Sequence, residues 1–300
     1  GLHDQTMKIA IPMKGRMIHA LDGTLTFQPY GKNDNEVIYA TSRGQLNMSL
    51  MEAAEKHDRV KIHFNETCTG MNIKTGELEL HNEATGTNTV IQCATVIGTD
   101  GSASAIRTEM LKTGRFNFSQ HYLERGYKEL VIPAGPHGNF QMEKNALHIW
   151  PRGTFMLIAL PNIDGSFTCT FFFPFEGQES FASLNTEDKV RSFFQKQFPD
   201  AVPLMPTLLE DFFTNPTGAM VTIKCHPWHV EDKVALLGDA AHAIVPFFGQ
   251  GMNCAFEDCT CMDECLATHG AEWDKLFQQF DQLRKINADA IADMALEHFI

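Results

Sequence analysis

The residue best placed to hold a ligand is Asp239, which follows the apolar run Val234-Ala235-Leu236-Leu237-Gly238. Such a run predicts a buried strand that ends at this acid, and ligands bind at the carboxyl ends of strands in open α/β sheets. A carboxylate there can accept hydrogen bonds from ligand hydroxyls, such as those of a ribose or ribityl chain. The alternative is an N-cap aspartate for a helix that starts at Ala240, and the residue alone leaves the two interpretations balanced.

The loop after this acid favours ligand binding. Gly249 and Gly251 permit close approach of the backbone to a ligand. A helix is predicted to begin at Met252 and Asn253, and the unpaired N–H groups of its first turn can stabilise negative charge on a ring system. An ordinary loop-to-helix junction is the alternative.

A second acid, Asp100, follows the apolar residues 94–98 and is followed by Gly101. Arg107 lies on the helix predicted next. The Asp-Gly pair is weak evidence by itself because it is also a common turn. Arg43, near another predicted helix start, is suited either to a cofactor phosphate or to an acidic partner within the protein.

Arg16 lies within the apolar residues 13–18, and Tyr30 follows Phe27-Gln28-Pro29. A guanidinium among apolar neighbours suits a planar anion such as a carboxylate, which a tyrosine hydroxyl can share. Taken alone, a surface arginine with a buried stem is the favoured interpretation.

Other kinds of site receive little support. His226 and His229 are separated by Pro227 and Trp228, with no acid or thiol completing a known metal pattern, so no metal site is predicted. Cys254, Cys261 and Cys265 fall on one face of a predicted helix and are expected to be packed thiols, and His242 is expected to be structural. There is no G-x-S-x-G element for serine hydrolysis and no G-x-G-x-x-G element.

Composition limits the class of protein. The chain has 300 residues, 43% of them hydrophobic and 20% charged, which is typical of a globular protein with a sizeable core. The formal net charge of −13 and the lack of a basic stretch argue against a nucleic-acid partner. No apolar run approaches the length of a membrane span and no signal peptide opens the chain. The helical pattern at its end and the missing initiator Met suggest a segment cut from a longer chain.

The elements that position these residues indicate an α/β fold. We expect a nucleotide-type layer interleaved with a mainly antiparallel sheet. Hairpins are predicted between 78–80 and 89–91 and between 155–160 and 166–173, and a helix over 187–198. The other expected elements are strands at 10–19, 36–41, 60–64 and 94–98, a helix from Ser42, and strand–turn–helix units from 94 and 231. The predicted domains are a cofactor domain (1–28, 41–123, 231–300) and a substrate domain (29–40, 124–230).

With these residues in view, the chain resembles the class A aromatic hydroxylases among the flavoprotein monooxygenases, and within them the kynurenine 3-monooxygenase family. The class motifs are LLGDAAH and VPFFGQGMN at 236–242 and 245–253, residues 256–258, and Asp100-Gly101 with Arg107. The narrower resemblance rests on residues 11–19, 29–31, 147–152, 158–162 and 166–170. Together these stretches extend over essentially the whole chain.

The resemblance implies that FAD is the cofactor and NADPH and O₂ are co-substrates. L-kynurenine would be hydroxylated at position 3 through a flavin C4a-hydroperoxide, a step of tryptophan degradation and NAD biosynthesis. The cofactor carries the chemistry, so no catalytic side chain is expected. Arg16 and Tyr30 would bind the substrate carboxylate. The implied pocket residues are Phe171, Phe172, Phe173, Pro246, Phe247 and Phe248, and the implied cofactor residues are Arg43, Asp100, Gly101, Arg107, Gly238, Asp239, Gly249, Gly251, Met252 and Asn253.

The family begins with a βαβ unit that carries G-x-G-x-x-G, and this chain is expected to start after it, leaving the α/β layer incomplete. The family also continues past the position of Ile300, in eukaryotic members with a membrane anchor. A cytoplasmic location is therefore expected only for a bacterial source, and activity of the 300 residues alone is doubtful. A homodimer is left open. The alternative functions are another class A hydroxylase, or a non-catalytic remnant that acts as a binding domain.

Overall fold

The computed structural model describes residues 2–33 and 35–297, and the chain divides by its internal contacts into two compact units. Unit 1 comprises residues 1–62 and 124–219, and unit 2 comprises residues 63–123 and 220–300. The mixed α/β fold predicted from the sequence is confirmed. The boundaries of the units differ from the predicted domain boundaries, because residues 1–28 and 41–62 fall in unit 1 and residues 220–230 fall in unit 2. The assignment of cofactor and substrate domains stays a prediction.

Unit 1 is built on a mainly antiparallel sheet in which neighbouring strands follow the order β9-β12-β11-β10-β2-β3. Among the strand pairs that the structure describes in this order, β10 and β2 pair in parallel and the others antiparallel. The predicted hairpin is confirmed, because β11 and β12 pair antiparallel with Pro161 opposite Phe167. The strands are β2 (Gly15–His19), β3 (Leu25–Pro29), β9 (Asn117–Ile132, in this unit from residue 124), β10 (Ala146–Arg152), β11 (Phe155–Pro161) and β12 (Phe167–Pro174).

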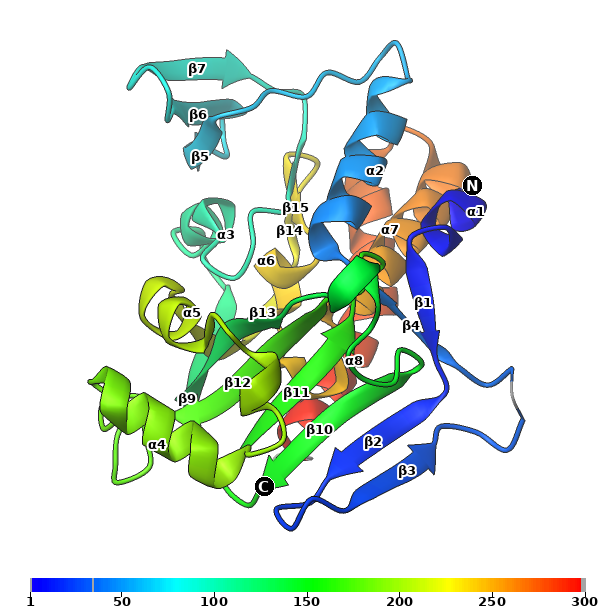
Figure 1. Ribbon diagram of the computed structural model, residues 1–300. Coiled ribbons are helices and arrows are strands. Elements are labelled where there is room, and N and C mark those ends of the chain that lie inside the picture. Colours follow the sequence, from blue (N-terminus) through cyan, green and yellow to red (C-terminus); the bar gives the residue numbers. More distant parts are fainter. Residues whose placement is uncertain (1, 34, 298–300) are drawn as a thin grey trace. The chain divides into compact units, whose positions relative to one another are not determined.

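Helices and a second small sheet complete unit 1. Ser42 caps α2 as expected, accepting a hydrogen bond from the Gln45 N–H at 3.4 Å. Strands β1 and β4 pair antiparallel, and α4 and α5 lie beside the large sheet (Figure 1). These elements are α1 (His3–Met7), β1 (Ala10–Met13), β4 (Ile38–Thr41), α2 (Arg43–Glu55), η1 (Pro136–Gly138), α4 (Glu187–Gln197), η2 (Val202–Leu204) and α5 (Leu208–Thr214).

The core of unit 1 follows from strand and helix periodicity. Alternate residues of β12 point to one face of the sheet, so Phe171 and Phe173 are both buried against α4. The apolar stripe predicted for 187–198 is confirmed, because Val190, Phe194 and the adjoining Phe198 are fully buried. The rings of Phe171 and Phe194 lie 5.1 Å apart between their centres. Packing of α4 therefore holds one face of the sheet that carries β2.

Unit 2 contains two small sheets and the longest helices. Strands β5, β6 and β7 pair antiparallel in that order, and β15 lies between β14 and β8, pairing in parallel with β8. Its hydrophobic core includes residues of α3, α6, α7 and α8. The elements are β5 (Glu66–Asn72), β6 (Glu77–Asn82), β7 (Asn88–Gln92), β8 (Val96–Gly98), α3 (Ala105–Met110), β13 (Thr217–His226, in this unit from residue 220), β14 (His229–Val230), β15 (Val234–Leu236), α6 (Asp239–His242), η3 (Pro246–Phe248), α7 (Gly251–His269) and α8 (Trp273–Glu297).

One predicted element is wrong. Residues 60–64 form no strand, and β5 begins only at Glu66. The alternation of Val60, Ile62 and Phe64 resembles a half-buried strand, but Val60 and Phe64 are exposed and no strand pairs with this segment. Within residues 2–33 and 35–297, no helix is both long enough and apolar enough to cross a membrane.

Candidate functional site

The two strand-end acids lie at the same edge of a sheet. Leu236 of β15 pairs with Gly98 of β8, and because the strands are parallel, Asp239 and Asp100 both follow their carboxyl ends. Asp239 is exposed at the start of α6 and forms no hydrogen bond or ion pair with any described residue. Its carboxylate is therefore available to a ligand at the position where α/β sheets bind ligands.

Asp100 has a different environment. Its Oδ1 accepts a hydrogen bond from the Ser104 hydroxyl at 2.6 Å, and its Oδ2 accepts one from the Ile106 N–H at 3.1 Å. The carboxylate thus holds the start of α3, and the adjoining Gly101 has a positive φ of 79°. A contact between this turn and a cofactor stays a prediction.

Arg107 lies inside unit 2 with only 4% of its surface exposed. Its guanidinium donates to the carbonyl oxygen of Ala240 at 2.6 Å and to that of Ser102, and burial lowers its pKa. It therefore connects α3 to α6, the helix that begins with Asp239. Direct contact between Arg107 and a cofactor stays a prediction, and its hydrogen bonds indicate that it holds the two turns together.

The loop before α7 has the features expected from its glycines. Gly249 adopts the left-handed conformation with φ 63°, and α7 begins at Gly251, so the predicted helix start is confirmed. Met252 and Asn253 are exposed, and Asn253 donates to the Gln250 side chain at 3.0 Å. In η3, Pro246 is exposed while Phe247 and Phe248 are half-buried. This loop offers polar and apolar groups to a ligand, and their contact with one stays a prediction.

Beneath the Gly238 turn lies a buried charged network that the sequence reasoning missed. The Asp258 carboxylate is fully buried and accepts hydrogen bonds from the Gly238 N–H at 3.0 Å, His242 Nε2 at 2.5 Å and Arg284 Nε at 2.8 Å. A sequence signal existed, because Asp258 follows Cys254 by four residues and so falls on the same buried helix face as Cys261 and Cys265. An acid on a buried face predicts a buried partner.

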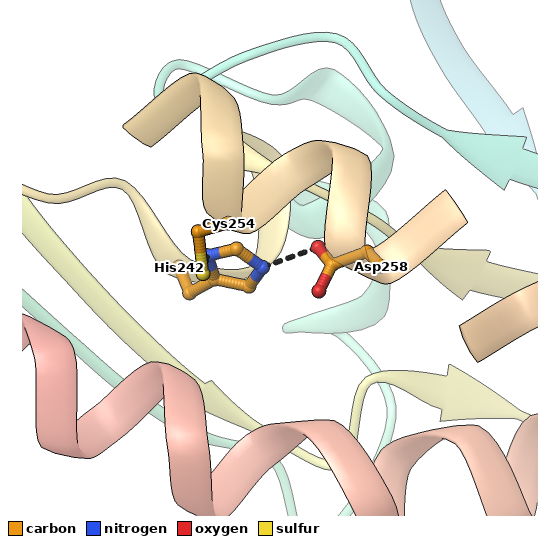
Figure 2. A group of neighbouring side chains, drawn as sticks. All are labelled: His242, Cys254 and Asp258. Atoms are coloured by element: carbon orange, nitrogen blue, oxygen red, sulfur yellow. Dashed lines mark hydrogen bonds and ion pairs between the residues drawn. The ribbon is translucent and has the colours of Figure 1, made fainter. Parts of the chain in front are cut away.

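Cys254, His242 and Asp258 are also chemically suited to bind a metal, since one ligand atom from each lies within 4.8 Å of the others. Figure 2 shows the imidazole of His242 between the Cys254 thiol and the Asp258 carboxylate. His242 Nε2 faces Asp258 and Nδ1 faces the Cys254 Sγ at 3.8 Å, so one ion cannot use both contacts of the ring. Arg284 also occupies the other carboxylate oxygen. The geometry favours a chain of hydrogen bonds, and the expectation of no metal stays a prediction.

The protonation states follow from these contacts. Burial acts to lower the pKa of His242, but the hydrogen bonds and charges of Asp258 and Cys254 outweigh it and raise this pKa to about 9. Burial acts in the opposite sense on Asp258, yet His242 and Arg284 hold its pKa below the usual value. At neutral pH the network therefore contains an imidazolium, a carboxylate and a guanidinium.

In unit 1 the structure brings Arg16 and Tyr30 together. The guanidinium carbon of Arg16 lies 5.4 Å from the centre of the Tyr30 ring. The Tyr30 hydroxyl is buried without a hydrogen-bond partner, and no carboxylate forms an ion pair with Arg16 among the described residues. Burial raises the pKa of Tyr30, with partial opposition from Arg16. An arginine without an acidic partner among the described residues, next to a buried tyrosine hydroxyl, is suited to bind an anionic ligand.

Two other predicted groups make contacts within unit 1. Arg43 forms an ion pair with Glu129 within unit 1, which matches the acidic-partner interpretation of this residue. Phe171 and Phe173 belong to the core against α4, because strand alternation directs both rings to the same face of the sheet, and their pocket role stays a prediction. Phe172 points to the opposite face, and its pocket role stays a prediction.

Comparison with known proteins supports the sequence-based resemblance. Residues 15–295 match a family described as "FAD binding domain". A kynurenine 3-monooxygenase from Myxococcus xanthus is 57% identical over 300 residues, with 100% of this chain and 64% of that protein covered. One from Dictyostelium discoideum is 50% identical over 311 residues, with 100% of this chain and 67% of that protein covered. The chain thus spans about two thirds of the length of these relatives.

Solved structures agree on the fold. A 2-methyl-3-hydroxypyridine-5-carboxylic acid oxygenase superposes with a TM-score of 0.71 at 20% identity, covering 98% of this chain and 76% of that one. A tetracycline destructase superposes with a TM-score of 0.67 at 18% identity, covering 99% and 74% respectively. At such low identity these structures establish the fold alone.

Proposed function

The chain belongs to the kynurenine 3-monooxygenase family and carries its FAD-binding domain, and from this premise we propose that the whole protein 3-hydroxylates L-kynurenine with FAD, NADPH and O₂. The observation that carries the proposal is an identity of 57% over the entire chain to a protein of that name. The two thirds of a relative's length present here contain both residues proposed to bind the substrate carboxylate.

The residues of unit 2 fit a flavin cofactor. The exposed Asp239 carboxylate has acceptor atoms for ribityl hydroxyls, and Gly238 with φ 64° lets the backbone turn where a side chain is disfavoured. We propose that the exposed Met252 and Asn253 at the start of α7 lie beside the ring system. When bound, FAD supplies the redox chemistry, taking electrons from NADPH and activating O₂.

The protein's own contribution is then binding and orientation. Arg16 would pair with the carboxylate of kynurenine, and the Tyr30 hydroxyl would donate a hydrogen bond to the same group. The half-buried rings of Phe247 and Phe248 would help to exclude water from the reacting atoms. No side chain needs to act as nucleophile, general acid or general base in this scheme.

The decisive experiment uses the full protein that contains this chain, loaded with FAD. NADPH oxidation is measured with and without L-kynurenine, and the products are analysed for 3-hydroxykynurenine. Kynurenine should accelerate NADPH oxidation and yield the hydroxylated product. Oxidation that responds to a phenolic acid but not to kynurenine would assign a different aromatic hydroxylase, and a protein that binds no FAD would favour the non-catalytic alternative.

Arg16→Ala tests the substrate site. Loss of a charge-assisted pair should weaken kynurenine binding by about 30- to 300-fold, or about 2–3.4 kcal/mol, with FAD content unchanged. Arg191→Ala is the matched control, because Arg191 is an exposed arginine on α4 of the same unit. Equal kynurenine affinity in the two variants would contradict the proposed role of Arg16.

A further inference from the structure

A fully buried carboxylate is energetically unfavourable in the interior of a protein. Asp258 lies on α7 with none of its surface exposed, on the same face as the packed thiols Cys261 and Cys265. Removing a charge from water is unfavourable unless partners replace the lost hydration. His242, Arg284 and the Gly238 N–H supply these partners, so the network is satisfied.

The contact with Gly238 distinguishes this network from a simple ion pair. Gly238 precedes α6, and its N–H donates to Asp258, outside any helix or strand ladder. Its carbonyl accepts from the N–H groups of Ala241 at 2.8 Å and His242 at 2.9 Å. The peptide on each side of Gly238 is therefore fixed, and the next residue is the exposed Asp239.

The backbone of the turn at Gly238 has little conformational freedom. Gly238 has φ 64° and ψ −143°, a conformation that favours glycine, and a Cβ there would lie 3.3 Å from the Cβ of Ala255 on α7. Leu237 is held on the other side by the Gly98 carbonyl of β8 at 3.0 Å. Asp258 thus provides the only anionic anchor of this turn among the described residues.

We infer that Asp258 is a positioning residue for the flavin site: it holds the Gly238 peptide and thereby directs the Asp239 carboxylate, while hydrogen bonds from His242 and Arg284 fix its own carboxylate. This inference rests on the proposed function, since it assumes that Asp239 meets FAD. Asp258 does not touch the cofactor in this scheme. It acts through the backbone of the turn.

The first test measures FAD dissociation constants by flavin fluorescence in the full protein and its Asp258→Asn variant. Asparagine keeps the size but has one acceptor oxygen for three donors. We expect FAD to bind at least tenfold more weakly, after correction for the folded fraction. Asp281→Asn is the matched control, because Asp281 is a 4% exposed acid on α8 that accepts from the Trp228 N–H and has no hydrogen bond to the Gly238 turn.

A second readout needs no substitution at Asp258. The titratable groups that face His242 are Asp258 and Cys254 of α7, and the ring of Trp228 packs against the imidazole. Arg284 of α8 binds the same carboxylate, and Arg107 of α3 binds the carbonyl of Ala240. Loss of the imidazolium proton weakens the support of Asp258, so FAD affinity should fall as the pH rises through about 9. In His242→Gln this step should be absent, whereas any titration of the flavin itself is common to both proteins.

The outcomes separate the two proposals. A wild-type protein that binds no FAD contradicts the proposed function. A wild-type protein that binds FAD, with Asp258→Asn within twofold of it or equal to Asp281→Asn, overturns the positioning role alone. If Asp258→Asn does not fold, the pH profiles of wild type and His242→Gln decide: the same profile in both overturns the inference, and a step seen only in the wild type supports it.

Discussion

Tyr30 carries a polar atom that the fold itself does not use. Its hydroxyl is buried beside Arg16 without a hydrogen-bond partner, and such an orphaned group costs stability in the free protein. A substrate carboxylate bound by Arg16 would satisfy it. If Arg16 binds a substrate carboxylate as proposed, the hydroxyl would contribute to ligand binding at the expense of folding.

Tyr30→Phe separates these two effects. Kynurenine affinity should fall about 3- to 10-fold, the value of one ordinary hydrogen bond, while the free energy of unfolding of the ligand-free protein stays equal or rises by about 1 kcal/mol. Calorimetric titration and urea unfolding measure the two quantities. A loss of stability without a loss of affinity would show that the hydroxyl serves the fold.

His242 makes the stability of unit 2 dependent on pH. Its pKa in the folded protein is raised to about 9, above an unfolded value of about 6.5. A raised pKa stabilises the folded state fully below pH 6.5, and this contribution disappears as the pH rises through about 9. The free energy of unfolding should thus decline by about 3 kcal/mol between pH 6.5 and pH 9. Urea unfolding across this range checks the slope, which should flatten in His242→Gln.

At the scale of elements, local patterns predicted most of what positions the site. The apolar run that ends at Gly238 predicted β15 and α6. The glycines of the next loop predicted the start of α7, and Ser42 predicted the cap of α2. In each case the signal and the structure involve neighbouring residues. Strand ends and helix starts are therefore readable where the backbone must change conformation within a few positions.

The failures concern partners that are distant in the chain. Residues 60–64 alternate like a strand, but a strand requires a neighbour to pair with, and none is supplied. From the sequence alone, Asp258 is simply a polar residue in a predicted helix. Its partner Arg284 lies 26 positions later in the chain, on α8. Arg107 is similar, because its main partner is the carbonyl of Ala240, 133 positions away. The shared face of Phe171 and Phe173, by contrast, follows from strand alternation alone, because residues two positions apart point to the same side of a strand.

At the scale of the whole molecule, each unit has its own hydrophobic core. Phe171 and Phe194 belong to the core of unit 1, and Trp228 and Phe280 belong to the core of unit 2. Cores formed by separate sets of residues permit separate local unfolding. The proposed substrate residues Arg16 and Tyr30 then depend on the first core, and the Gly238–Asp239 turn depends on the second.

Hydrogen exchange measured by mass spectrometry on the full protein tests this division. Phe194→Ala leaves a cavity in the core and should lower the free energy of unfolding by about 3–5 kcal/mol. It should accelerate amide exchange mainly in residues 124–219. Phe280→Ala, the matched change in the other core, should act mainly on residues 220–297 and should also weaken FAD binding, because α8 carries Arg284 and through it supports Asp258. If exchange accelerates evenly over both units in each variant, the two cores unfold together. The proposed substrate and flavin residues would then depend on one common free energy of unfolding.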